Sequence, residues 1–157
     1  MKVILQSTII SLFATILVGC TNTIKKNELE GIWKSDDGAV LFLYANGTYH
    51  AKRLNLYPIF EDENFKNKKT NLTGRWQIGE TGNQKKQTIE LSSNLTFKDF
   101  DVDDTYIDEN GSKQSYNIHC TFIISETGIF EFKKTYILYS QIGDPDDMNR
   151  YQFKKMN

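Results

Sequence analysis

Three aspartates at alternate positions, Asp99, Asp101 and Asp103, have the spacing in this sequence that comes nearest to a metal site. Carboxylates at the first, third and fifth positions open a common calcium-binding loop. That loop also needs a glycine at position six and a bidentate glutamate at position twelve, where this sequence has Asp104 and Asn110. We therefore interpret the run as a solvated acidic turn rather than a calcium site.

Other reactive side chains are few and scattered. His50 and His119 are the only histidines, and His119 falls on the strand face opposite Ile118 and Cys120, so we expect it to be solvent-exposed. Cys120 alternates with apolar residues, which is typical of a small buried hydrophobe. No Ser-His-Asp order, phosphate-binding glycine loop or paired-carboxylate motif stands out. The sequence therefore predicts no enzyme activity, no catalytic residue, no metal ion and no cofactor.

The N-terminal segment has the three regions of an export signal. Lys2 supplies a positive charge, residues 3–18 carry none, and the stretch closes on Leu17-Val18-Gly19-Cys20. These last four residues resemble the lipobox of bacterial lipoproteins. The resemblance implies cleavage before Cys20, a diacylglycerol on its thiol and an acyl chain such as palmitate on the new N-terminus, so that the protein is anchored outside the cytoplasm. Thr21, where aspartate is associated with inner-membrane retention, implies the outer membrane.

An uncleaved transmembrane helix is the alternative interpretation of this segment. The apolar stretch is shorter than the roughly 20 residues needed to span a bilayer. It is also diluted by five polar side chains, Gln6, Ser7, Thr8, Ser11 and Thr15. We therefore expect a signal peptide at residues 1–19, a tether at 20–29 and one domain at 30–157.

The composition of the remaining chain fits one small domain. Removal of residues 1–19 leaves 138 of the 157 residues. The formal net charge of the whole chain is −1, and no basic face is evident, so nucleic-acid binding is excluded. If Cys20 becomes a thioether, Cys120 is the only free thiol and no intramolecular disulfide can form. The domain must therefore be stabilised by its core alone.

Short runs of β-branched and aromatic residues, broken by Gly, Asn and Asp, predict an all-β fold. The clearest hairpin joins residues 39–44 to 48–54 through Asn46-Gly47, which we expect in a type I′ turn. A second joins 116–125 to 129–140 around Glu126-Thr127-Gly128. Further strands are expected at 32–35, 72–78, 88–92 and 151–155, with 95–100 as another candidate and 99–112 as a turn-rich connection. This pattern favours a small antiparallel up-and-down β-barrel of about eight strands, because closure removes exposed edges.

The segment 55–70 interrupts the strand pattern with a short helix or a loop insertion. Its apolar side chains stand among charged ones and are Leu56, Tyr57, Ile59, Phe60 and Phe65. One hypothesis is a short amphipathic helix that covers one end of the barrel. The other is a surface loop whose aromatic rings pack on the outer wall. In a hollow barrel these five residues are the candidate ligand or lid contacts.

Two Gly-x-Trp motifs, Gly31-Ile32-Trp33 and Gly74-Arg75-Trp76, and the hairpin around Asn46-Gly47 resemble the strands of lipocalin-like (calycin) barrels. A glycine allows a tight strand entry that a Cβ would obstruct, and the tryptophan two residues later buries a large area. The resemblance implies that a tryptophan plugs one end of the barrel under an arginine from the last strand. This makes Trp33, Trp76 and Arg150 the candidate plug, with a surface position as the alternative for Arg150.

Two functions follow from these observations. The first is a membrane-tethered, non-enzymatic barrel that binds a small apolar ligand or a lipid in its mouth. The alternative is a protein-interaction module of the envelope, such as an inhibitor or an assembly accessory, whose barrel is packed solid. The 10 phenylalanines and 8 tyrosines supply enough aromatic volume to fill the interior. Whether the inward-facing positions leave a void decides between the two.

Overall fold

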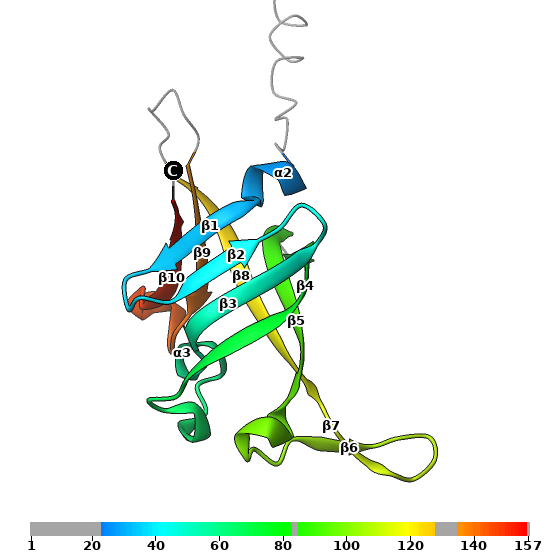
Figure 1. The fold of residues 1–157 in the computed structure, drawn as a ribbon. Coiled ribbons are helices and arrows are strands. Elements are labelled where there is room, and N and C mark those ends of the chain that lie inside the picture. Colours follow the sequence, from blue (N-terminus) through cyan, green and yellow to red (C-terminus); the bar gives the residue numbers. More distant parts are fainter. Residues whose placement is uncertain (1–22, 83–84, 128–134, 157) are drawn as a thin grey trace, which may run out of the picture.

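The protein is an all-β structure built on a closed antiparallel barrel, and the computed structural model describes residues 23–82, 85–127 and 135–156 (Figure 1). Eight strands close in the order β1-β10-β9-β8-β5-β4-β3-β2. Each pairs with its neighbour in the chain, except that β5 pairs with β8 and β1 closes on β10. The barrel strands are β1 (Gly31–Ser35), β2 (Val40–Leu43), β3 (Thr48–Asn55), β4 (Lys69–Thr81), β5 (Lys86–Thr96), β8 (Asn117–Thr127), β9 (Thr135–Gln141) and β10 (Arg150–Lys155). The predicted up-and-down barrel of about eight strands is confirmed.

Alternation of apolar and polar residues sets which side chains enter the barrel. In β8, Ile118, Cys120 and Phe122 are buried, whereas His119 and Thr121 between them are exposed. Strand pairing places buried residues of neighbouring strands beside each other. Leu91 of β5, for example, lies opposite Cys120 of β8. The predictions of a buried Cys120 and an exposed His119 are therefore confirmed.

The predicted turn type of the first hairpin is wrong. Three residues, not two, separate Tyr44 from Thr48, and of these only Gly47 has a positive φ, at 79°. The Gly47 amide donates to the Tyr44 carbonyl at 3.0 Å, and the Tyr44 amide donates to the Thr48 carbonyl at 3.0 Å. This is a type I turn followed by a left-handed glycine, the usual three-residue hairpin loop. The Asn46 side chain stabilises it by accepting from the Thr48 amide and hydroxyl.

The second predicted hairpin is present as the β8–β9 pair. Glu126 pairs with Tyr136 and Thr127 with Thr135, so two of the three predicted turn residues belong to the ladder, and the third, Gly128, lies outside the described residues. The predicted strand residues 129–134 lie outside the described residues. The connection 99–112 is also more ordered than expected, since it contains β6 (Thr105–Ile107), which pairs with β7 (Lys113–Ser115). The candidate strand 95–100 is β5 only as far as Thr96 and then becomes the 3-10 helix η2 (Phe97–Phe100).

Short helices lie at the two ends of the barrel, as Figure 1 shows. At one end lies α2 (Lys26–Leu29), within the segment expected to be a tether, and its last residue Leu29 is fully buried. At the other lie α3 (Tyr57–Phe60), η1 (Glu63–Phe65) and η2, while η3 (Pro145–Asp147) precedes β10. Within the described ranges no helix has the length and apolarity to cross a bilayer.

Candidate functional site

The interior of the barrel is filled with large side chains. Trp33, Tyr49, Phe122 and Phe153 are among the largest fully buried side chains of the described residues, together with many aliphatic ones. Phe122 and Phe153 meet edge to face, with ring centroids 5.4 Å apart. A side chain that lined a water-sized void would keep accessible surface, and Trp33, Phe122 and Phe153 keep none. No room for a ligand is therefore found beside these rings.

One polar group stands out inside this core. The Tyr49 side chain is buried, and Ser93, also buried, faces its hydroxyl without a hydrogen bond of normal geometry. Burial raises the pKa of Tyr49 far above its usual range. A desolvated hydroxyl without a partner costs free energy of folding. Among the described residues, the Tyr49 hydroxyl is therefore an isolated, unpaired polar group in the core and does not belong to a set of converging polar groups.

The two tryptophans of the Gly-x-Trp motifs lie at the α2 end of the barrel. Trp33 donates from Nε1 to the Leu29 carbonyl at 2.8 Å, and Trp76 donates to the Tyr44 carbonyl at 2.9 Å. The Lys26 ammonium lies 4.9 Å from the centroid of the Trp76 ring. The helix α2 thus joins both indoles to the end of the barrel. The motifs differ in their glycines, since Gly31 (φ 129°) begins β1 but Gly74 lies within β4.

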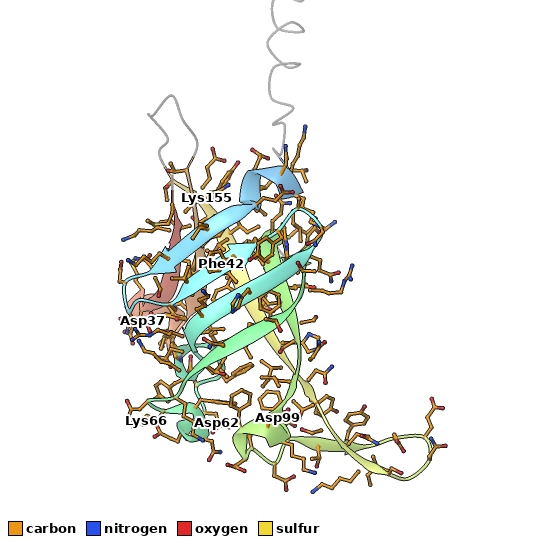
Figure 2. All side chains as sticks on the ribbon, in the orientation of Figure 1. Asp37, Phe42, Asp62, Lys66, Asp99 and Lys155 are labelled. Carbon is orange, nitrogen blue, oxygen red and sulfur yellow. The ribbon has the colours of Figure 1, made fainter. Side chains whose placement is uncertain are left out.

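Of the two positions considered for Arg150, the surface position is confirmed, because Arg150 is exposed, and the stack on Trp33 is wrong. Arg150 lies at the start of β10, and its guanidinium carbon is 4.4 Å from the centroid of the Tyr139 ring on β9. The cation over Trp33 is Lys155 at the other end of the same strand, 5.8 Å from the ring centroid, and Figure 2 shows it at the α2 end. Five residue steps along the strand, about 17 Å, separate the Cα atoms of Arg150 and Lys155. Lys155 also donates to the Glu28 carbonyl at 2.6 Å.

The five predicted ligand or lid contacts lie at the opposite end. Leu56 and Phe65 are fully buried, whereas Tyr57, Ile59 and Phe60 are partly buried against the core. The helical turn α3 packs against β9 and β10, so the structure matches the hypothesis of a short helix over one end of the barrel. Since Leu56 and Phe65 have no exposed surface, they close this end instead of lining an open mouth.

An aromatic cluster connects this closed end to η2. The Phe65 ring lies 5.7 Å from Phe100 and 6.0 Å from Phe97, and the Phe60 ring lies 5.2 Å from Phe97, between centroids. The 55–65 segment therefore holds η2 in place. Because η2 leads directly into β6, the cluster also fixes the base of the β6–β7 hairpin.

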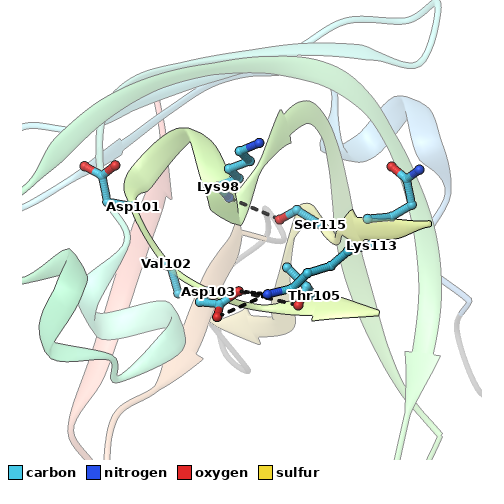
Figure 3. Close-up of a pocket in the computed structure, with 8 residues that line it drawn as sticks. Lys98, Asp101, Val102, Asp103, Thr105, Lys113 and Ser115 are labelled. Atoms are coloured by element: carbon cyan, nitrogen blue, oxygen red, sulfur yellow. Dashed lines mark hydrogen bonds and ion pairs between the residues drawn. The ribbon is translucent and has the colours of Figure 1, made fainter. Parts of the chain in front are cut away.

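The β6–β7 hairpin projects from the barrel beyond this end (Figure 1). A cavity of about 380 Å³ lies at its base, open to solvent and bounded by η2 and both strands (Figure 3). Lys113 bridges it by an ion pair with Asp103 at 3.1 Å, and the Ser115 hydroxyl accepts from the Lys98 amide at 3.1 Å. A second open cavity of about 350 Å³ lies at the α2 end, where Tyr136 donates to Glu28 at 2.9 Å.

The carboxylates of Asp99, Asp101 and Asp103 do not converge on one point. Asp99 caps η2 by accepting from the Thr96 amide and hydroxyl, and these hydrogen bonds lower the pKa of its carboxyl. Figure 2 shows Asp99 at the end opposite Lys155. Asp103 pairs with Lys113 instead. Within the part of the chain that the structure describes, no three His, Cys, Asp or Glu side chains gather as a metal site.

Asp37, in the β1–β2 turn (Figure 2), stands at the centre of a partly buried polar network. Its carboxylate accepts from the Ser35 hydroxyl, the Ala39 amide at 3.3 Å and the Tyr151 hydroxyl at 3.5 Å, and it pairs with Lys69 at 3.1 Å. Partial burial acts to raise the pKa of Asp37, but the hydrogen bonds from Ser35 and Lys69 outweigh it and hold the pKa below its ordinary value. Every partner belongs to the barrel, so the network supports the fold.

The remaining reactive groups are separated from one another. Burial raises the pKa of the Cys120 thiol to about 12, so it stays protonated at neutral pH. His119 lies on the outer wall, 3.1 Å from the Ser92 hydroxyl, and His50 lies against the Phe42 ring with centroids 6.0 Å apart. Cys20, the predicted lipidation site, lies outside the described residues.

Sequence reasoning missed the projecting hairpin, Lys155 and the partners of the aromatic cluster. The hairpin could have been found from two short strand-like segments on either side of a turn with Asp108 and Gly111. These segments are Thr105-Tyr106-Ile107 and Lys113-Gln114-Ser115. No protein-family model, no curated protein and no solved structure matches this chain.

Proposed function

We propose that this protein is a lipid-anchored, non-enzymatic module of the bacterial cell envelope that acts by binding another protein. The packed interior is the observation that carries the proposal. Fully buried aromatic rings occupy the inward-facing positions, and buried residues close both ends of the barrel. A barrel of eight strands has an interior just wide enough to be filled by side chains or to hold one small ligand, and here side chains occupy it.

A small apolar ligand in the barrel mouth is the competing function. Such a ligand would have to displace Leu56 and Phe65 at one end, or Trp33 and Leu29 at the other, all of which are fully buried. Each displaced side chain would lose about 1.5–3 kcal/mol of burial. The outer surface, where the hairpin projects with exposed apolar side chains, is the better place for recognition.

Anchoring through Cys20 to the outer membrane forms the second part of the proposal, and it rests on the lipobox-like motif Leu17-Val18-Gly19-Cys20. Diacylglycerol plus an acyl chain on the N-terminus would bury enough methylene groups for stable attachment. Palmitate labelling and membrane fractionation test this part. Cys20→Ala should abolish the label and release the protein from membranes, and a variant that stays in the membrane fraction would contradict it.

Native mass spectrometry of the full chain, purified from membranes of its own host, tests the choice between the two functions. We expect the lipidated mass without a further bound small molecule, and a protein partner in samples crosslinked before extraction. A stoichiometric apolar molecule that survives purification would refute the packed-barrel function. Phe122→Leu is the matched control for ligand binding inside the barrel. It keeps an apolar residue at this core position but changes the shape of the interior that a small ligand would have to fit.

A further inference from the structure

The β6–β7 hairpin is held at its base by hydrogen bonds and projects away from the barrel (Figure 1). The Ser115 hydroxyl donates to the Asp104 carbonyl at 3.1 Å, and the Tyr116 amide donates to the same carbonyl at 3.3 Å. The Phe97 amide donates to the Tyr116 carbonyl at 3.0 Å. The first two bonds join the bases of the two strands, and the third ties Tyr116 to η2, which the aromatic cluster fixes to the closed end. The hairpin is therefore a positioned arm.

This arm exposes more apolar surface than its own stability needs. Ile107 is 75% exposed, and Tyr106 and Tyr116 are 41% and 48% exposed. The two tyrosine rings lie on one face with centroids 4.7 Å apart, the diagonal arrangement of a cross-strand pair. Tyrosine and other aromatic side chains are enriched at the centres of protein interfaces because they bury a large area with few rotatable bonds. Ile107 follows Tyr106 directly in β6 and therefore points to the opposite face of the hairpin. Exposed apolar side chains on both faces of a projecting element indicate a protein-binding surface.

Charge decides which partner suits the arm. Residues 98–113 contain six aspartates and glutamates but only two lysines. Asp103 is paired with Lys113, whereas Asp101, Asp104 and Glu109 have no ion-pair partner among the described residues. A second copy of the same arm would bring like charges together, and an anionic lipid surface would be repelled in the same way. A surface rich in lysine and arginine complements it.

We propose that the β6–β7 hairpin is the docking arm of this protein and that it binds a basic, partly apolar segment of another envelope protein. The inference rests on the proposed function and names the site and the partner class. The Tyr106–Tyr116 pair on one face of the arm and Ile107 on the other supply the apolar contact, while Asp104 and Glu109 supply the attraction. An arm of this size is smaller than the 20–30 residues per side of a standard stable interface, so the association is transient and salt-sensitive.

Photocrosslinking of the full, membrane-anchored chain in cells of its own host tests this inference. A benzophenone amino acid replaces Ile107 on the arm or, as the control, Ile32, which is also exposed but lies on the barrel wall at the α2 end. Neither position is in the core, so both variants fold. We expect a protein adduct from position 107 but not from 32, with a net positive crosslinked peptide of the partner.

Charge removal supplies the second measurement. Asp104→Asn with Glu109→Gln should lower the yield of the adduct about fivefold, since two exposed ion pairs are lost. Asp146→Asn with Asp147→Asn makes the same charge change on η3 and should leave the yield unchanged. Higher salt should reproduce the effect of the first pair. An adduct that is unaffected by the first pair, or equally affected by both, would overturn the inference.

The outcomes separate this inference from the proposed function. An adduct with a second copy, with lipid or with a segment lacking positive charge overturns the docking arm as proposed. Protein adducts from exposed wall positions such as Ile32 or Tyr44 but not from Ile107 also overturn it and leave the proposed function standing. If no exposed position yields a protein adduct, both are refuted.

Discussion

Truncation of Phe122 gives the most direct measure of whether the barrel is solid. Phe122 points inward from β8, is fully buried and packs edge to face on Phe153 with centroids 5.4 Å apart. In a packed core the loss of a phenylalanine ring costs the transfer free energy and leaves a cavity, together about 3–5 kcal/mol. At about 4 °C per kcal/mol for a domain of this size, Phe122→Ala should lower the melting temperature by about 12–20 °C.

Urea unfolding of the purified protein in detergent, followed by fluorescence of the two buried tryptophans, measures this loss. Phe42→Ala is the matched control, because Phe42 lies between the buried Leu41 and Leu43 and so faces outward, where it is only half-buried. Its truncation should cost about 1 kcal/mol or less. The Phe122 variant, and not the native protein, should also bind a small apolar probe such as benzene. Equal costs for the two truncations would show that Phe122 lines a void and would refute the packed interior.

Four further predictions follow from individual contacts. Gly74→Ala should lower the free energy of unfolding by about 1–3 kcal/mol in the same urea titration, because a Cβ there would overlap the backbone of β5. Gly79→Ala should lower it less, because its Cβ would meet a glutamate side chain that can move. Tyr49→Phe should leave the unfolding midpoint unchanged or raise it, since the buried hydroxyl makes no hydrogen bond of normal geometry, and a clear fall would reveal a bound partner. The Asp37 carboxyl has a lowered pKa in the folded state, so the stabilisation that it supplies is present above the ordinary carboxyl pKa of about 4 and is lost as the pH falls below that value. In Asp37→Asn the free energy of unfolding should therefore fall less between about pH 5 and pH 2 than in the native protein. Cys120 should resist a thiol reagent at pH 8 in the folded protein and react on unfolding in urea, and reaction in the native state would contradict its burial.

Local patterns were sufficient to predict the barrel because alternation along each strand determines which face is buried. Ile118, Cys120 and Phe122 carry that signal within a single strand. The turn at 44–48 was mistaken because the last hydrogen-bonded pair is Tyr44–Thr48, so that Ala45 belongs to the loop and the loop has three residues instead of two. The type of a turn depends on its exact length, whereas the pairing of the strands does not.

The arrangement of the site depends on contacts between residues that are far apart in the sequence. The sequence alone does not show these contacts. The Phe60 and Phe65 rings pack on Phe97 and Phe100, more than thirty positions later in the chain. Their aromatic character predicted burial, but not that their partner would be the base of a second hairpin. Similarly, Arg150 and Lys155 lie on the same last strand, and only the register of β10 against β1 places Lys155 at Trp33.

The attachment of residue 24 to the barrel places the proposed anchor near the α2 end. The Ile24 amide donates to the Gln87 side chain at 2.8 Å, at the start of β5. Only three residues separate Ile24 from Cys20, so their Cα atoms lie within about 14 Å of each other in any conformation. Lipidation of Cys20, as proposed, would therefore keep the α2 end close to the bilayer.

The same strand carries the arm away from that end. From Gln87 to Thr96, β5 runs nine residue steps, about 30 Å, and η2 and the hairpin follow directly. With the proposed anchor at one end and the proposed docking arm beyond the other, the barrel would act as a spacer. A solid core would suit that role, because a rigid barrel would keep Ile107 at a fixed distance from the membrane, whereas a hollow barrel would need an opening at one of the two ends that α2 and α3 close.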